Sequence, residues 1–169
     1  MGSTLEVVAH DAHHIIGRWK NLAMAIWRHE TQGPAVEAFH KLQANMAKEY
    51  SQGIALLQVV EENGLLPDGP TRAALAKMLR EGAPYVKTSA IVHEGDGFKA
   101  AAVRGVVTSL TMLAKPAFPH KIYSTVDKAL EWEVSQVPAV DSLRVGLAPT
   151  LGMFNSLRGE LNRLTGTTS

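Results

Sequence analysis

The stretch that decides the fold covers residues 54–93 and reads IALLQVVEENGLLPDGPTRAALAKMLREGAPYVKTSAIVH. It begins with the nearly continuous apolar run Ile54–Val60, which is typical of a strand covered on both faces. After a loop rich in Gly and Pro, apolar residues at helical spacing predict a helix over residues 70–81, with Asp68 as its cap. The stretch ends with a second strand, Val86–His93. A strand, a helix and a strand of these lengths predict a parallel unit with a right-handed crossover.

The same alternation continues on both sides of this stretch. Upstream, Gly33-Pro34 opens a helix that reaches about Tyr50. Downstream, the sequence predicts a helix over 98–114, a short strand over 120–124 and a helix over 126–136. In the helix 98–114 we expect Gly105 to permit close approach to the sheet and the apolar side chains to face inward, namely Val103, Val106, Val107, Leu110 and Leu113.

Three β-like stretches precede the alternation, at residues 5–10, 13–20 and 22–29, with short polar breaks suited to tight turns between them. They predict antiparallel strands at one edge of the sheet. The expected fold is therefore α/β: a mixed β-sheet with N-terminal antiparallel strands and parallel β-α-β units, helices packed on the sheet, and a C-terminal helical extension.

The last part of the chain follows a different pattern. Pro138 ends the alternation, so we expect an α/β domain over residues 1–137 and a helical extension over 138–169. Along this extension, apolar residues recur every three or four positions. Two interpretations stay open: a terminal helix docked on its own domain, or a face that forms a homodimer. The residues of this face are Leu151, Phe154, Leu157, Leu161 and Leu164.

Composition narrows the class of protein. The 169 residues carry a formal net charge of +1, which indicates neither a nucleic acid nor an anionic membrane as partner. The chain contains no cysteine, which excludes disulfides and thiolate metal sites. Neither a signal peptide nor an apolar run long enough to cross a bilayer is evident. We therefore expect a globular, cytoplasmic protein with no integral membrane segment.

At this point the sequence resembles the bacterial STAS/SpoIIAA-like group, which is named after anti-sigma-factor antagonists. The resemblance covers about the first 137 residues in element order. It is carried by the strand Ile54–Val60, the segment 67–75 (PDGPTRAAL), the helix 98–114 with Arg104, and the segment 121–124 (KIYS) before 129–132 (ALEW). It implies a sheet backed by helices that serves as a regulatory interaction module.

The resemblance also implies a switch in one loop. In the antagonists, a phosphorylatable Ser in an Asp-Ser turn stands where a strand loop enters a helix. Here Asp68 matches the Asp, but no Ser stands beside it and Thr71 is the nearest hydroxyl. A helix N-terminus can receive an anion or a phosphorylated Thr71, with Arg72 as counter-charge. The alternative is an ordinary capped helix start.

Other candidate motifs are weaker. The residues His10, Asp11, His13 and His14 form the densest group of potential metal ligands, yet their spacing matches no metal signature. The loop Glu94-Gly95-Asp96-Gly97-Phe98 lacks the Lys-Ser/Thr ending of a phosphate-binding loop, and we expect it to dock Phe98 into the core. The carboxylates of Glu61, Glu62, Glu131 and Glu133 are interpreted as solvated charge. The sequence predicts no catalytic residue, metal or cofactor.

Taken together, these patterns predict a non-enzymatic regulatory or scaffold module that binds another protein. The expected surface lies where strands lead into helices, at Asp68, Thr71, Arg72, Glu94, Asp96 and Phe98. An alternative is a small-molecule or lipid-binding domain, with a cleft between the helix 98–114, the sheet and the C-terminal helix.

Overall fold

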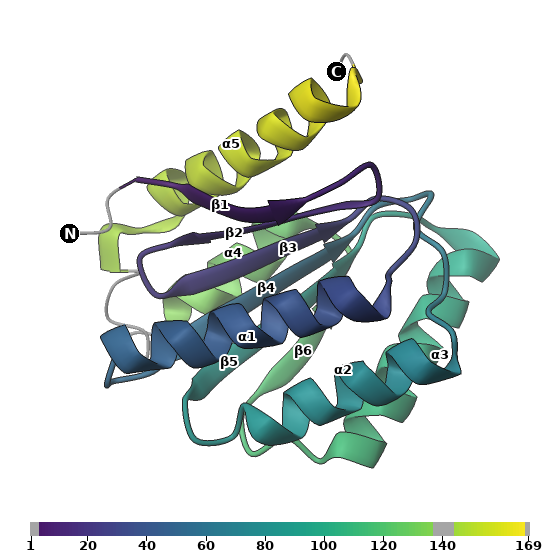
Figure 1. Ribbon diagram of the computed structural model, residues 1–169, viewed down its shortest axis with the longest axis horizontal. Helices are drawn as coiled ribbons and strands as arrows, with labels where there is room; N and C mark the ends of the chain where they lie inside the picture. The colour runs from purple at the N-terminus through teal and green to yellow at the C-terminus, as the bar shows by residue number, and fades with distance from the viewer. Residues whose placement is uncertain (1–3, 137–143, 168–169) are drawn as a thin grey trace.

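The fold is an α/β sandwich around one six-stranded sheet (Figure 1), described by a computed structural model for residues 4–136 and 144–167. The strands lie in the sheet in the order in which they occur in the chain: β1 (Glu6–His10), β2 (His14–Trp19), β3 (Leu22–Trp27), β4 (Ile54–Val60), β5 (Val86–His93) and β6 (His120–Tyr123). The helices are α1 (Gly33–Glu49), α2 (Gly69–Glu81), α3 (Gly97–Ala114), α4 (Val126–Ser135) and α5 (Leu147–Thr165).

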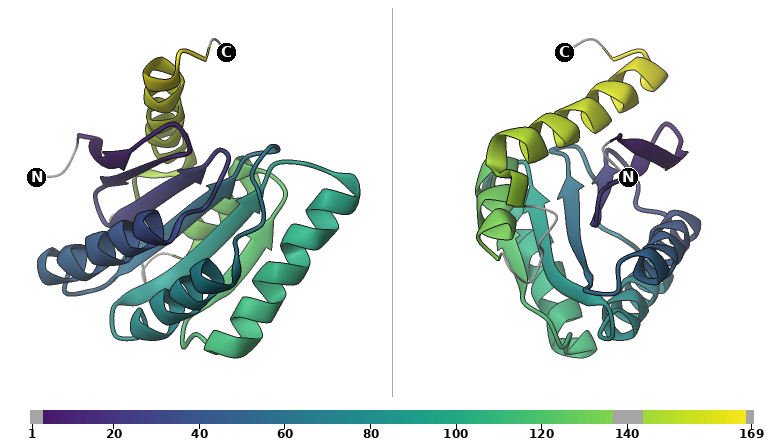
Figure 2. Two further views of the ribbon diagram at one scale, coloured as in Figure 1. Left: turned by 45° about the vertical axis from the view of Figure 1, so that its right-hand side comes forward. Right: turned by 90° about the vertical axis from the view of Figure 1, so that its left-hand side faces the viewer.

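The sheet is mixed, as the sequence predicts. Strands β1, β2 and β3 pair antiparallel, whereas β3, β4, β5 and β6 pair parallel. Each of the three crossovers, through α1, α2 and α3, moves one strand further in the same direction. Because such connections are right-handed, these helices lie on the same side, with α3 toward the β6 edge, and α4 lies on the opposite side (Figure 2). The predicted fold class is confirmed.

The alternation of side chains on the strands separates two hydrophobic cores. On β4, Ile54 and Leu56 join the core under α1 and α2, whereas Leu57 and Val59 join the core under α4 and α5. All six residues of β3 are buried. A strand that is covered on both faces explains why the pattern over residues 22–27 is continuous rather than alternating.

Helix α3 presents a different face from the one that the sequence predicts. Its buried residues are Ala100, Val103, Val107, Leu110 and Ala114. Leu113 is 66% exposed and Phe98 is 91% exposed, so the expectations that Leu113 faces inward and that Phe98 docks into the core are wrong. Gly105 has open space where a Cβ would lie, so it does not serve close packing on the sheet. The helix is apolar on more than one side, and its composition therefore does not define the buried side.

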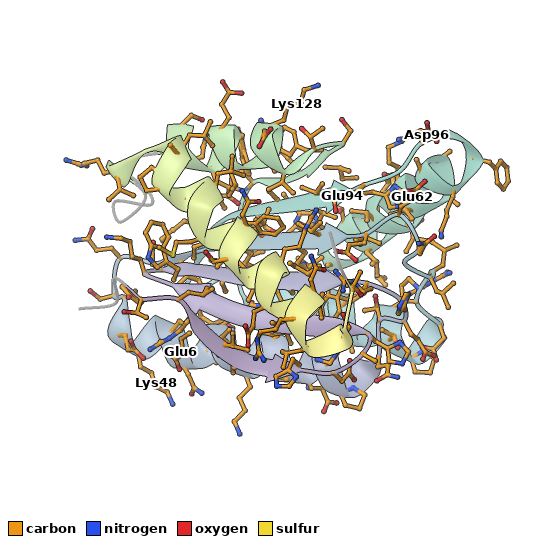
Figure 3. The ribbon with its side chains drawn as sticks, turned by 90° about the horizontal axis from the view of Figure 1, so that it is seen from above. Glu6, Lys48, Glu62, Glu94, Asp96 and Lys128 are labelled. Carbon is orange, nitrogen blue, oxygen red and sulfur yellow. The ribbon has the colours of Figure 1, made fainter. Side chains whose placement is uncertain are left out.

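The C-terminal helix α5 runs diagonally across the strands on the α4 side of the sheet (Figure 3). Phe154, Leu157 and Leu161 are buried in the same core as β2–β5. The helix therefore docks on its own sheet, the first of the two interpretations above. In this position these three side chains are not available to a second chain, and only Leu151, which is half-buried, and Leu164, which is 37% exposed, reach the surface.

The boundary expected at residues 137 and 138 lies outside the described residues. None of the helices in the described ranges is both long and apolar enough to cross a membrane.

Candidate functional site

The carboxyl ends of the parallel strands form one edge of the sheet, where α/β proteins bind ligands. A polar crevice of about 660 Å³ lies at this edge. The loop after β4 contributes Glu61, Glu62 and Asn63, the loop after β5 contributes Glu94, Gly95 and Asp96, and α5 contributes Arg158. Figure 3 shows Glu62, Glu94 and Asp96 together at this end of the molecule.

Arg28, directly after β3, ties this edge to α5. Its guanidinium makes a bidentate pair with Glu61, with Nε at 2.6 Å from Oε2 and Nη2 at 3.1 Å from Oε1. Nη2 also donates to Asn162 Oδ1 at 2.6 Å, and Nη1 donates to Thr165 Oγ1 at 2.9 Å. All three nitrogens of Arg28 therefore have protein partners, and two of them hold the end of α5.

A second arginine extends this network. Arg158 on α5 donates from Nη2 to Glu94 Oε1 at 2.7 Å and lies 3.8 Å from Glu61 Oε1. Its guanidinium carbon lies 4.9 Å from the centre of the Phe154 ring, within the range of a cation–π contact. The two arginines and two glutamates, Glu61 and Glu94, neutralise one another, so this network holds α5 in place.

The predicted cap of the 70–81 helix is confirmed. Asp68 Oδ1 accepts the backbone N–H of Thr71 at 2.8 Å, and hydrogen bonding by the Thr71 side chain, followed by that of its backbone, lowers the pKa of the Asp68 carboxyl. Arg72 Nε donates to the carbonyl of Pro67 at 2.9 Å. Thr71 is only 4% exposed, so a kinase would reach its hydroxyl only after the start of α2 opened.

The predicted surface residues lie at or just before the starts of α2 and α3, at the same edge of the sheet, but they do not line a common pocket. The crevice contains Glu94 and Asp96 but not Asp68, Thr71 or Arg72. Asp96 stands at the N-cap of α3 without a hydrogen bond from its side chain to the helix. The sequence did not single out two neighbouring exposed residues, Leu65 at 57% and Leu66 at 44% exposure.

The histidines near the N-terminus build a turn. Asp11 Oδ1 accepts the backbone N–H groups of His13 at 2.7 Å and His14 at 3.1 Å. His14 is 6% exposed, and burial lowers its pKa. Among the residues for which the structure gives a position, no three or more His, Asp or Glu side chains are grouped so that they could hold a metal ion.

An apolar cavity between α2, α3 and the sheet is a feature that the sequence did not locate. Its walls include Leu75 and Met78 from α2, Val103 and Val107 from α3, and Ile91 from β5. The cleft expected from the sequence includes the C-terminal helix as a wall. That part is wrong, because α5 packs with the core on the opposite side of the sheet.

Polar side chains also line this cavity: Thr31 and Gln58 are buried, and His120 is half-buried. His120 on β6 lines the cavity, and its Nδ1 lies 2.9 Å from Ser89 Oγ. Its Nε2 has no hydrogen-bond partner within residues 4–136 and 144–167, and burial lowers the pKa of the imidazole to about 4. His120 is therefore neutral near pH 7. This pairing could not be predicted from the sequence, because residues 89 and 120 meet only through the register of β5 and β6.

Glu133 on α4 is a second feature that the sequence did not identify. Its side chain is fully buried against β5, where Thr88 Oγ1 donates a hydrogen bond to Oε2. Burial raises the pKa of Glu133 to about 8, although hydrogen bonds from Thr88 and the backbone of Ala90 oppose this shift. The expectation that this carboxylate is solvated charge is therefore wrong.

Comparisons with models of known protein families, with curated proteins and with solved structures find no match. The resemblance to the SpoIIAA-like group stays a prediction from the sequence.

Proposed function

We propose that the protein is a non-enzymatic, cytoplasmic regulatory or scaffold module of STAS/SpoIIAA-like type, which binds another protein at the starts of α2 and α3. The observation that carries this proposal is the exposure of three large apolar side chains there, namely Phe98 at 91%, Leu65 at 57% and Leu66 at 44%. Leu65 and Leu66 precede α2 and Phe98 lies at the start of α3, so they follow neighbouring strands of the sheet, and large exposed apolar side chains are a common mark of a protein-binding surface.

The charges around these side chains suit a polar rim. Asp68 and Asp96 are exposed at the N-caps of α2 and α3, and Arg72 is exposed in the first turn of α2. In the neighbouring crevice, Glu61 and Glu94 are held by arginines. Protein interfaces combine an apolar centre with a polar, solvent-accessible rim. This arrangement supports binding of a protein rather than chemistry on a substrate.

The test is quantitative affinity purification from cells of the source organism with the wild-type protein and two double variants. Leu65→Ser/Phe98→Ser removes the proposed apolar centre. Met112→Ser/Leu113→Ser is the matched control, because these residues lie near the other end of α3 and are 72% and 66% exposed. We expect proteins that co-purify with the wild type and the control to be lost with Leu65→Ser/Phe98→Ser.

A third variant tests the polar part of the surface. Asp68→Ala/Arg72→Ala removes the two exposed charges at the start of α2 and leaves the apolar residues in place. We expect weaker recovery of the same proteins. If this variant and Leu65→Ser/Phe98→Ser both retain every partner of the wild type, the surface proposed here is wrong.

A second candidate function is the binding of a small molecule in the cavity under α3. The observation that favours it is the buried His120 Nε2, which has no partner at the wall of an apolar cavity. Ligand pockets are mostly apolar, with a few placed polar groups. Native mass spectrometry of the purified protein tests this candidate. We expect an additional mass that disappears on denaturation, and its absence together with no thermal shift across a panel of lipids and small molecules would count against it.

A further inference from the structure

The walls of the cavity between α2, α3 and the sheet carry no formal charge. Among the residues with a described position, no Asp, Glu, Lys or Arg lines it, and the only titratable wall residue, His120, is neutral near pH 7. An ion inside such walls would lose its hydration without gaining an opposite charge, which costs several kcal/mol or more. A ligand that enters the cavity therefore has to be uncharged.

The cavity nevertheless offers hydrogen bonds. A neutral imidazole has one donor and one acceptor nitrogen, and a hydroxyl can serve in either role. Ser89 Oγ contacts Nδ1 of His120, and Nε2 has no hydrogen-bond partner among the described residues but is itself covered, so a ligand reaches this donor or acceptor only after a small shift of the imidazole or of the cavity wall. Gln58 also lines the cavity. Its Oε1 accepts from Trp27 Nε1 at 3.2 Å, while its amide nitrogen makes no hydrogen bond within the described part of the chain.

The size of the cavity limits the ligand further. A water-sized sphere can occupy about 60 Å³ inside it, whereas a single water needs roughly 10–15 Å³ on this measure. The space thus accommodates about four to six water-sized groups, which corresponds to one ring with a short substituent. A long acyl chain does not fit inside unless α3 moves.

We propose that this cavity binds an uncharged, largely apolar molecule of about one ring in size, whose single hydrogen-bonding group contacts His120 Nε2 or the Gln58 amide. This inference rests on the second candidate function and specifies its ligand class. It predicts discrimination against carboxylates and amines of the same size. We therefore expect fatty acids and charged lipids to bind less tightly than an uncharged molecule of one ring.

The experiment is calorimetric titration of the intact protein near pH 7 with four probes of one ring each: benzyl alcohol, benzoate, benzylamine and toluene. We expect benzyl alcohol to bind at least ten-fold more tightly than benzoate or benzylamine, and more tightly than toluene. His120→Phe should remove the preference for benzyl alcohol over toluene, because the variant lacks the nitrogen that the hydroxyl contacts.

A matched pair of variants on α3 locates the binding. Val107→Phe fills the cavity, since Val107 lines it and is 6% exposed, whereas Leu113→Phe places the same ring on the outer side of the helix, where Leu113 is 66% exposed. We expect the first to abolish binding and the second to leave it unchanged. If circular dichroism shows that Val107→Phe does not fold, Val106→Phe fills the same cavity from the next position.

The outcomes separate this inference from the candidate function on which it rests. If benzoate or benzylamine binds as tightly as benzyl alcohol, and Val107→Phe abolishes this binding, the proposal that the ligand is uncharged is wrong. Small-molecule binding in the cavity would then still stand. If Val107→Phe and Val106→Phe both retain binding, the ligand binds outside this cavity, and the proposed site is wrong. No heat with any probe, together with no retained mass, would overturn both.

Discussion

Glu133 shows how a single residue can make the stability of this protein depend on pH. The helix α4 points this carboxyl at β5, where it is fully buried and its hydrogen-bond donors, the hydroxyl of Thr88 and the backbone of Ala90, are uncharged. A carboxylate in such a place loses hydration that these donors do not replace. The folded protein therefore binds a proton at Glu133 that the unfolded chain has already released at the same pH.

The sign of the resulting effect follows from the two pKa values. The pKa of Glu133 rises from 4.5 to about 8 on folding, so its contribution to stability is complete below pH 4.5 and decreases up to about pH 8. We expect the free energy of unfolding to fall by as much as about 1.4 kcal/mol per pH unit within this window. In Glu133→Gln this decrease should be absent.

Urea unfolding between pH 6.5 and pH 8 measures the effect. His120 is neutral in both folded and unfolded states over most of this range, because its pKa changes from 6.5 to about 4. Glu131→Gln is the matched control, since Glu131 is exposed on the same helix. Identical pH dependence in the wild type and Glu133→Gln would contradict the burial of an ionisable Glu133.

Replacing glycine by alanine should have opposite effects on stability at two positions. Gly105 lies inside α3 with open space around it, so Gly105→Ala should stabilise the protein by about 1 kcal/mol through helix propensity. At Gly17 on β2, a Cβ would lie 2.8 Å from Leu157 Cδ1 and 3.0 Å from the carbonyl oxygen of Glu6. Gly17→Ala should therefore destabilise the protein by about 1–3 kcal/mol.

Thermal unfolding of the two variants checks this pair. A higher midpoint for Gly105→Ala and a lower one for Gly17→Ala are expected. If Gly17→Ala unfolded at the temperature of the wild type, the close approach of α5 to β2 would be wrong.

The contacts and burial of some side chains can be predicted from the sequence, and those of others cannot. The cap joins Asp68 to Thr71, three positions later in the chain, so the local sequence is sufficient to predict it. The burial of Glu133 depends on which side of α4 meets the sheet, and Glu131 and Glu133 look equivalent in the sequence. The contact between His120 and Ser89 depends on strand register, which no short segment encodes.

At the scale of elements, α5 shows why a periodic apolar face has more than one interpretation. Leucines at three- and four-residue steps predict a helix with one apolar side, and the same side suits a second chain or the sheet of its own chain. The choice is made by side chains far away in sequence. Arg28 bonds to Asn162 and Thr165, and Glu94 bonds to Arg158.

The docking of α5 predicts a large loss of stability from one substitution. Leu157 is fully buried between α5 and the sheet, so Leu157→Ala should lower the free energy of unfolding by about 2–5 kcal/mol. Leu164→Ala, at 37% exposure on the same helix, should have a much smaller effect. Urea unfolding of both variants measures the difference, and equal effects would indicate that α5 does not pack as described.

At the scale of the whole molecule, the order of strands follows from local rules. Strands that alternate with helices become parallel neighbours, and the common hand of the crossovers fixes the side on which α1, α2 and α3 lie. These rules act along the chain, so the sequence predicts the fold class. The cavity is a property of three elements together, and it depends on how closely α2 and α3 approach the sheet and each other.

The difference in packing between α1 and α3 predicts that parts of the molecule open at different rates. Helix α1 buries large side chains, namely Val36, Phe39, Leu42 and Met46. Helix α3 lies toward the β6 edge over the cavity, and two of its five buried residues, Ala100 and Ala114, are alanines. The free energy needed to open an element locally decreases with the apolar contacts that it loses. Helix α3 should therefore open more often than α1.

Hydrogen–deuterium exchange of the intact protein tests this prediction. We expect the central amides of α3 to exchange about ten-fold faster than those of α1, or more, because a ten-fold difference requires only about 1.4 kcal/mol less opening free energy. Val107→Phe fills the cavity beneath α3 and should slow the exchange of α3 without changing that of α1. Equal protection of the two helices in the wild type would mean that the cavity does not weaken the attachment of α3, and that α3 opens together with the rest of the sheet.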